Sequence, residues 1–239
     1  MSKLPNAPLQ EVIFELRWNI SNKEDLNRFQ FLMGDLYSSL KDKYPFRQSL
    51  FPPEFPLDVL IHHPTYRFRH KENDYPLFQV GPGILSLNTN DAKYYWEDFY
   101  EWTEELLTVF LAANNQVDSY STSIIFLDFF KIDFEKTDVL EFINNNFNLK
   151  FSQSFYETTK FPNYINLGLQ YETEFGNLNI SLNNGKQDVE DGLVLNTKIT
   201  GFNKNPEKEE IMIWLKNSKA LCSKLFKKLT EGDLYNSFN

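Results

Sequence analysis

Apolar residues alternate with polar ones in three successive segments of the last third of the chain. The segments are 165–171, 178–182 and 193–199, and most of their alternate positions are leucine or isoleucine. A period of two directs these side chains to one face of a strand. Turn-forming sequences, "EFGN" and "NNGKQDVEDG", separate the segments. The pattern therefore predicts an antiparallel three-strand meander.

Four other stretches repeat apolar residues every three or four positions, which is typical of helices packed on one side. The first follows Ser21-Asn22-Lys23-Glu24, which has the spacing of a capping box. We expect the others to start at Asn90, at Thr137 and near Asn205-Pro206. The last helix should end at Gly232 and turn to the core its apolar face, namely Ile211, Trp214, Ser218, Leu221, Leu225 and Leu229.

The remaining segments read mostly as strands. "EVIFELRW" alternates, with Val12, Phe14 and Leu16 on one face, and "SIIFLDFFKI" is a nearly continuous apolar run typical of a central strand. "TYRFRH", "YPLFQV" and "ILSLN" are short strand patterns, whereas residues 46–64, with four prolines, predict an irregular crossing segment.

Strands grouped in hairpins and separated by helices indicate an α+β fold with a mostly antiparallel sheet. About four helices pack on it, including a long C-terminal one. We expect a single domain over residues 1–239, with a subdomain seam near 133–160.

Charge and composition narrow the functional classes. The net charge of −9 does not favour nucleic acid, whose binding needs clustered Lys and Arg. The single cysteine, Cys222, excludes an internal disulfide and fits a reducing compartment. There is no signal-peptide pattern and no apolar run of membrane-spanning length, so we expect a cytoplasmic protein with no membrane partner.

The stretch "FQVGPGILSLNTND" raises the question of a phosphate-binding loop. Such loops need a following Lys and Ser or Thr, or a third glycine, at the start of a helix. Here a strand pattern follows, and Pro82 removes a backbone N–H that a phosphate would use. We therefore interpret Gly81-Pro82-Gly83 as a hairpin turn whose glycines supply positive φ.

Three groups of residues are candidates for binding. Arg67 and Arg69 alternate with aromatic residues on one strand, a pattern that binds single-stranded nucleic acid in other proteins. Glu97, Glu101 and Glu105 belong to an acidic stripe that would dock a basic partner. Asp128 lies inside an apolar strand, where a carboxylate is costly unless paired. Each group also has a purely structural interpretation, as a solvated face or a satisfied buried carboxylate.

No complete catalytic or metal-binding constellation is evident. His62, His63 and His70 do not have a zinc spacing, and Cys222 has no partner histidine signalled by sequence. We therefore assign no catalytic residue, no metal ligand and no cofactor.

Several stretches resemble an uncharacterised, sporadically distributed bacterial family of about this length: "LPNAPLQEVIFELRW", "PLFQVGPGILSLNTND", "YYWEDF" and "LFKKLTEGDLYNSF". The family's strand after the second helix carries Arg and Tyr, whereas "STSIIFLDFF" here lacks the Arg. The resemblance supplies no catalytic residues. Its sporadic distribution implies genes on mobile elements, such as defence or toxin–antitoxin systems.

Three functions remain open. We favour a non-enzymatic accessory module that binds another protein, such as an effector encoded beside it; homo-oligomers fit as well. The second is a metal-dependent nuclease or hydrolase in which Asp128, Asp133 and Glu135, with Lys131, converge in space. The third is a small-molecule binder with a cavity between the sheet and the C-terminal helix.

Overall fold

The computed structural model of the chain describes residues 3–114, 119–152, 162, 164–204 and 207–239. The described helices are α1 (Lys23–Leu40), α2 (Trp96–Ala113), α3 (Val139–Asn146), α4 (Lys208–Leu229) and α5 (Asp233–Asn236), with 3-10 turns η1 (Leu57–Leu60) and η2 (Asp91–Lys93). The strands are β1 (Leu9–Arg17), β2 (Phe46–Ser49), β3 (Tyr66–Arg69), β4 (Leu77–Gly81), β5 (Ile84–Asn90), β6 (Ser119–Lys131), β7 (Asn166–Thr173), β8 (Gly176–Gln187) and β9 (Glu190–Lys204).

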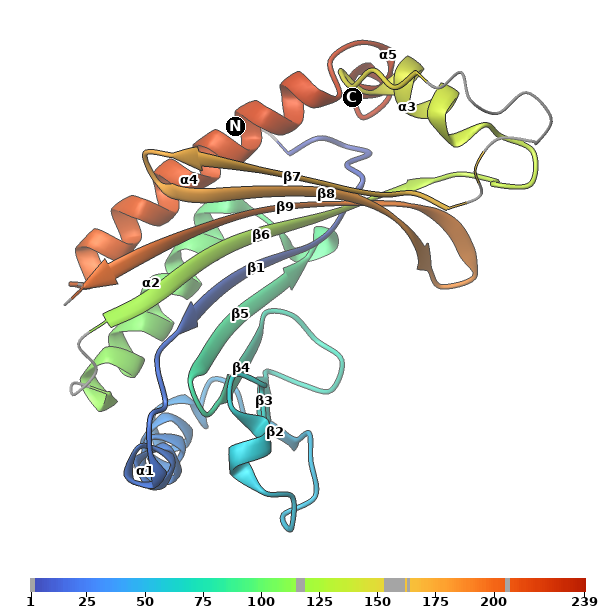
Figure 1. Ribbon diagram of the computed structural model, residues 1–239. Helices are drawn as coiled ribbons and strands as arrows, with labels where there is room; N and C mark the ends of the chain where they lie inside the picture. The colour runs from blue at the N-terminus through green and yellow to red at the C-terminus, as the bar shows by residue number, and fades with distance from the viewer. Residues whose placement is uncertain (1–2, 115–118, 153–161, 163, 205–206) are drawn as a thin grey trace. The chain divides into compact units, whose positions relative to one another are not determined.

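The described strands form one antiparallel sheet in the order β2-β3-β4-β5-β1-β6-β9-β8-β7 (Figure 1). Most sequence neighbours are also sheet neighbours, and the helices are inserted between groups of strands. This arrangement confirms the predicted α+β class, the meander in the last third and the long C-terminal helix.

The chain divides into two compact units. The first contains residues 1–10, 126–199 and 217–239, and the second contains residues 11–125 and 200–216. The boundaries fall within β1, β6, β9 and α4, whereas the expected seam at 133–160 lies inside the first unit.

The second unit buries one face of its strands beneath α1 and α2. Val12, Phe14 and Leu16 are fully buried, as their alternation predicts. Burial of such side chains contributes about 1.5–3 kcal/mol each. Trp18 continues this face, with its ring 5.0 Å from that of Phe110 on α2. The opposite face of β1 carries Glu11, Glu15 and Arg17 and is therefore the polar one.

Helix α1 begins one residue later than the capping box in the sequence suggests. Asn22, not Ser21, is the N-cap, and its side chain accepts the backbone N–H groups of Glu24 and Asp25. The carboxylate of Asp25 accepts the backbone N–H of Ser21 in return, at 2.9 Å. Asparagine caps as well as serine does, so spacing alone did not identify the cap.

The hairpin interpretation of "GPG" is confirmed, but a positive φ angle explains only one of its two glycines. Gly81 pairs with Ile84 across the turn, and Gly83 has φ +78°. A Cβ on Gly81 would lie 1.9 Å from the carbonyl oxygen of His63, so this glycine permits a close backbone approach instead.

Three local predictions need correction. Helix α4 ends at Leu229 and not at Gly232, which has φ +123° and precedes α5. The proline-rich stretch 46–64 is not wholly irregular, since it contains β2 and η1. The helix expected from Asn90 begins at Trp96; Asn90 caps the short turn η2 by accepting the N–H of Lys93.

In the first unit, aromatic side chains join α3 and α5 to the end of β6. The ring of Phe130 lies 5.0 Å from that of Phe147 and 6.3 Å from that of Phe238. The expected short helix begins with Asp138 as its N-cap. The expected start of the last helix, Asn205-Pro206, lies outside the described residues.

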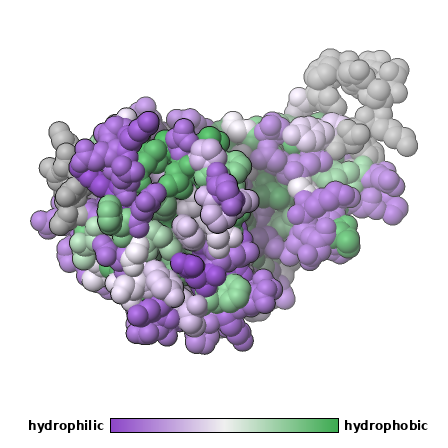
Figure 2. All heavy atoms as spheres, turned by 90° about the horizontal axis from the view of Figure 1, so that it is seen from below, coloured by the Kyte–Doolittle hydropathy of each residue, from purple (hydrophilic) through white to green (hydrophobic). Residues whose placement is uncertain are grey.

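Hydrophilic residues predominate on the face shown in Figure 2, and hydrophobic ones occur there in separate groups. Among the described helices, none combines the length and the apolar character that crossing a membrane requires.

Candidate functional site

The register of the β7–β8 hairpin gathers apolar side chains on one face. Leu169 pairs with Ile180, Leu167 with Leu182 and Tyr171 with Leu178. Because these pairs occur at every second position of both strands, their side chains lie next to one another on the same face of the hairpin. Leu195 of β9 extends the same surface. These seven side chains form a continuous apolar surface, which we call the wall.

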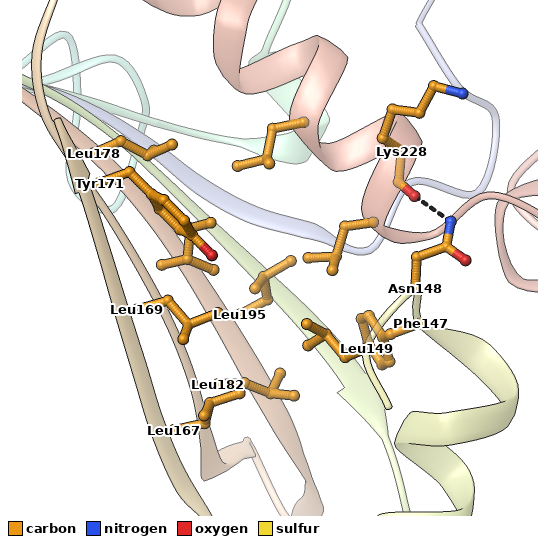
Figure 3. A pocket seen from close by; sticks show the side chains of 13 residues that line it. Phe147, Asn148, Leu149, Leu167, Leu169, Tyr171, Leu178, Leu182, Leu195 and Lys228 are labelled. Atoms are coloured by element: carbon orange, nitrogen blue, oxygen red, sulfur yellow. Dashed lines mark hydrogen bonds between the residues drawn. The ribbon is translucent and has the colours of Figure 1, made fainter. Parts of the chain in front are cut away.

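The last turns of α4 and the segment after α3 face this wall. Leu225 and Leu229 come from α4, and Phe147 and Leu149 come from the segment after α3. Asn148 ties the two together, because its backbone N–H donates to the carbonyl of Leu229 at 2.7 Å and its side-chain amide to the carbonyl of Lys228 at 2.5 Å. The dashed line in Figure 3 marks the second of these bonds.

A pocket of about 350 Å³ lies between the wall and the helix, entirely within the first unit. Leucine and isoleucine supply most of its lining (Figure 3). Leu182 and Leu195 are each 1% exposed and close its inner end, whereas Tyr171 is 49% exposed. The pocket is therefore deep at the sheet and reaches the surface beside Tyr171.

Among the described residues that line the pocket, only Lys228 has a charged side chain, and its amine pairs with Glu231 at 3.0 Å. Figure 3 shows this amine directed away from the other lining side chains. A charged group inside would be desolvated without a partner, which is unfavourable. The described lining therefore favours an apolar occupant.

A cavity between the sheet and the C-terminal helix was one of three hypotheses from the sequence, but the residues that line the pocket were expected only as core. The alternating residues of 165–171 and 178–182 were expected to face inward, as were Leu225 and Leu229. The segment Phe147–Leu149 gave no signal of a binding role, except that Leu149 is an apolar residue outside any helix or strand. Nothing local reveals that these groups leave a space between them.

The predicted binding residues lie in other places. Arg67 and Arg69 are half-buried on β3, in the second unit. The guanidinium of Arg67 donates to Gln79 at 2.8 Å, and that of Arg69 lies 6.0 Å from the ring centre of Tyr75. They are close neighbours on one strand face, as the alternation predicts.

The acidic stripe on α2 is partly neutralised by its own unit. Glu105 pairs with Lys43 at 2.6 Å, and Glu104 pairs with Lys208 at 3.3 Å. Glu97 is exposed in the first turn of the helix, where the helix dipole stabilises negative charge, and Glu101 is exposed in the next turn. The stripe therefore has a structural explanation that requires no basic partner.

Asp128 is 5% exposed and lies close enough to Cys222 for its charge to act on the thiol. Burial, and secondly the charge of Asp128, raises the pKa of Cys222 to about 12. A thiol with so high a pKa is a poor nucleophile at neutral pH. Cys222 therefore acts as a small core residue.

The carboxylates of the hydrolase hypothesis are engaged separately. Asp133 pairs with Lys136 at 2.7 Å, and this hydrogen bond lowers the pKa of Asp133. Lys131 pairs with Glu190. Within the described parts of the chain, no three His, Cys, Asp or Glu side chains come together as a metal site. Nothing in this geometry gathers the predicted residues around one reacting atom.

The side chains of the three histidines lie within hydrogen-bonding distance of backbone carbonyl groups. The ring nitrogen Nδ1 of His62 lies 3.1 Å from the carbonyl oxygen of Gly83, and that of His63 lies 3.1 Å from the carbonyl of Ile61. His70 approaches the carbonyl of Lys43 at 3.3 Å.

Comparisons with known proteins add no relative: no family model, no curated protein and no solved structure matches the chain. The pocket and the other residues must therefore be interpreted from their own geometry.

Proposed function

We propose that the protein is a non-enzymatic binding protein that holds one apolar small molecule in the pocket between β7–β9 and α4. The observation that carries the proposal is a space of about 350 Å³ with an almost purely aliphatic lining. Ligand pockets begin at about 300 Å³, so the space suits one small ligand.

The lining supports an aliphatic chain as the ligand class. Leucine and isoleucine side chains surround the space, and the aromatic lining residues are Phe147 and Tyr171. Aliphatic walls contact a flexible chain from all sides, whereas a stacking site for a planar ring uses aromatic faces. Filling the space also restores the dispersion contacts that the lining atoms lack when it is empty.

The polar end of such a ligand belongs at the mouth. The exposed Tyr171 lies there, and the apolar lining disfavours a buried carboxylate or amine. An alcohol, ester or acid with a hydrocarbon chain satisfies both conditions when the chain points inward.

Titration with N-phenyl-1-naphthylamine, an uncharged fluorophore that brightens in apolar surroundings, tests the proposal. We expect saturable binding with a stoichiometry of one and displacement by dodecanol. Leu169→Trp narrows the pocket and should weaken binding about tenfold or more, equivalent to about 1.4 kcal/mol. Gln170→Trp places the same ring on the other face of β7 and serves as the matched control, with unchanged binding.

Two results would contradict the proposal. One is the absence of saturable binding to a folded wild-type protein. The other is equal binding by the Leu169→Trp and Gln170→Trp variants, because the fluorophore then occupies a different surface.

A protein-partner module is the second candidate, and the edge position of β7 favours it. Among the described strands, β7 has a neighbour on one side only. An exposed edge offers backbone groups to an added strand from a partner. The two candidates differ in measurement: a partner strand would protect the β7 amides from hydrogen exchange, whereas dodecanol would leave their exposure to solvent unchanged.

A further inference from the structure

A row of polar side chains crosses the strands of the second unit on the face opposite α1 and α2. The register aligns five side chains, one on each strand: Gln48, Arg67, Gln79, Ser86 and Glu15. Three of these are almost fully buried, with Ser86 at 3%, Gln79 at 8% and Glu15 at 9% exposure. Buried polar groups on a sheet face are retained only when they are satisfied.

Hydrogen bonds connect this row into a network. Arg67 donates to Gln79, whose amide donates to Asn88 at 3.2 Å. The amide of Asn88 donates in turn to Glu11 at 2.8 Å. Such a chain fixes the orientation of each member. The Nε–H of Arg67 is therefore held against Gln79, which orients the rest of its guanidinium.

Arg67 and Arg69 differ from the paired arginines of the chain. Arg17 pairs with Glu15, and Arg28 pairs with Glu24. In the part of the chain that the structure describes, no carboxylate lies within 4.0 Å of Arg67 or Arg69, although both are half-buried. A half-buried guanidinium without a counter-ion is energetically costly.

The Nε atom of Arg69 is buried and has no hydrogen-bond acceptor among the described residues. Its guanidinium lies over Tyr75, and the charges of both Arg69 and Arg67 reach the Tyr75 hydroxyl. Burial, followed by the charge of Glu11, raises the pKa of Tyr75, so its hydroxyl remains a donor at neutral pH. The two guanidinium groups and this hydroxyl therefore form one cluster of donors.

We propose that Arg67, Arg69 and Tyr75 bind the carboxylate or phosphate group of a small polar molecule. Guanidinium groups match the oxygens of these anions, and the pair stands i and i+2 on one strand face, so both reach the same group. Gln48 and Gln79 flank Arg67 in its row and bind the polar remainder of the ligand. This site lies in the second unit and does not depend on the apolar pocket.

A small molecule fits this face better than nucleic acid does. Glu11 and Glu15 share the face with the arginines, and a polynucleotide would bring its phosphates close to them. The chain also carries a net charge of −9. A compact anion that binds Arg67, Arg69 and Tyr75 is small enough to avoid most of this repulsion.

NMR of the arginine Nε–H groups in the full-length protein tests this proposal at pH 7. Inorganic phosphate and acetate serve as separate probes, at constant ionic strength set with chloride. We expect saturable shifts at Arg67 and Arg69 with a Kd of about 1–10 mM, the range that a pair of charge-assisted hydrogen bonds supports. The relative affinity of the two probes distinguishes a phosphate site from a carboxylate site.

The matched control is Arg47→Gln on the neighbouring strand β2, where Arg47 stacks near Tyr37 on the helix side. This variant should bind both probes normally, whereas Arg69→Gln should weaken binding at least tenfold. If Arg69→Gln fails to fold, the proposal is tested by the wild-type protein alone: saturable shifts confined to Arg67 and Arg69 support it, and equal shifts at all arginines contradict it.

Three outcomes would overturn the proposal. The first is a set of linear, unsaturated shifts that are equal at Arg28, Arg47, Arg67 and Arg69. Such shifts indicate non-specific accumulation of anions around the protein. The second is normal binding by a folded Arg69→Gln variant. The third is a response of Arg67 and Arg69 to an oligothymidylate but to neither small anion, which identifies a nucleic-acid surface.

Discussion

Leu169 on β7 lies directly opposite Ile180 on β8, and both side chains line the apolar pocket of the first unit. Ile180 is 7% exposed, whereas Leu169 is only half-buried because β7 is the last strand of the described sheet. A cross-strand pair of this kind normally completes a core. Here one member borders an open space, so the same contact supports both the sheet and the pocket.

Two leucines on β9 should differ in their contribution to stability because one borders the pocket. Leu195 lines the pocket, whereas Leu193, on the same strand face, is fully buried away from it. A side chain beside an existing cavity has fewer neighbours to lose. We expect Leu193→Ala to lower the free energy of unfolding by about 4 kcal/mol and Leu195→Ala by about 2 kcal/mol. Urea denaturation measures both, and equal losses would show that the pocket is filled by protein atoms in solution.

Asn22→Ala should destabilise α1 more than Ser21→Ala does. Asn22 accepts two backbone N–H groups, whereas the Ser21 hydroxyl accepts only from the nearby Asn19 side chain. We expect a loss of about 1 kcal/mol for Asn22→Ala and a few tenths for Ser21→Ala. Thermal unfolding followed by circular dichroism gives the two values, and the reverse order would reinstate Ser21 as the cap.

Glycine positions in the second unit should respond to alanine in opposite directions. Gly34 lies in α1 with open space around its Cα, so Gly34→Ala should stabilise the protein by about 0.5–1 kcal/mol. Gly81→Ala places a Cβ 1.9 Å from the carbonyl oxygen of His63, and we expect a loss of about 2–3 kcal/mol. Chemical denaturation of both variants provides the comparison. A neutral Gly81→Ala would mean that the hairpin is free to move away from His63.

Cys222 should resist alkylation in the native protein. Because burial raises the pKa of Cys222 from 9.0 to about 12, we expect the thiolate fraction at pH 8 to be about a thousandfold smaller in the folded protein than in the unfolded chain. Because the folded protein favours the neutral thiol, Cys222 contributes fully to the free energy of unfolding below pH 9, and this contribution is lost as the pH rises from 9 towards 12. Iodoacetamide labelling at pH 8, with and without urea, measures the difference. Rapid labelling of the native protein would contradict the buried position.

Local residue patterns were sufficient to predict most of the strands and helices and the faces that they turn inward. Val12, Phe14 and Leu16 alternate strictly, and the structure buries all three completely. The same rule identified the strands at 165–171 and 178–182, because the period of a strand or helix is written in adjacent residues. Helix ends were less secure: either Ser21 or Asn22 fits a cap chemically, and the backbone geometry selects Asn22.

Long-range packing, which no local pattern records, brings particular residues into contact. The apolar pattern of Leu167, Leu169 and Leu225 is the same for a filled core and for a walled pocket. The difference arises from how far α4 and Asn148 stand from the sheet, a distance that no local pattern encodes. In the same way, the basic pattern of Arg67 and Arg69 gave no indication that neither pairs with a carboxylate of the described residues. Strand pairing between segments far apart in the chain sets the distances to the acidic residues, as it does for Asn88 and Glu11, which are 77 positions apart. Local sequence fixes periodicity, whereas the spaces and charge partners depend on long-range packing.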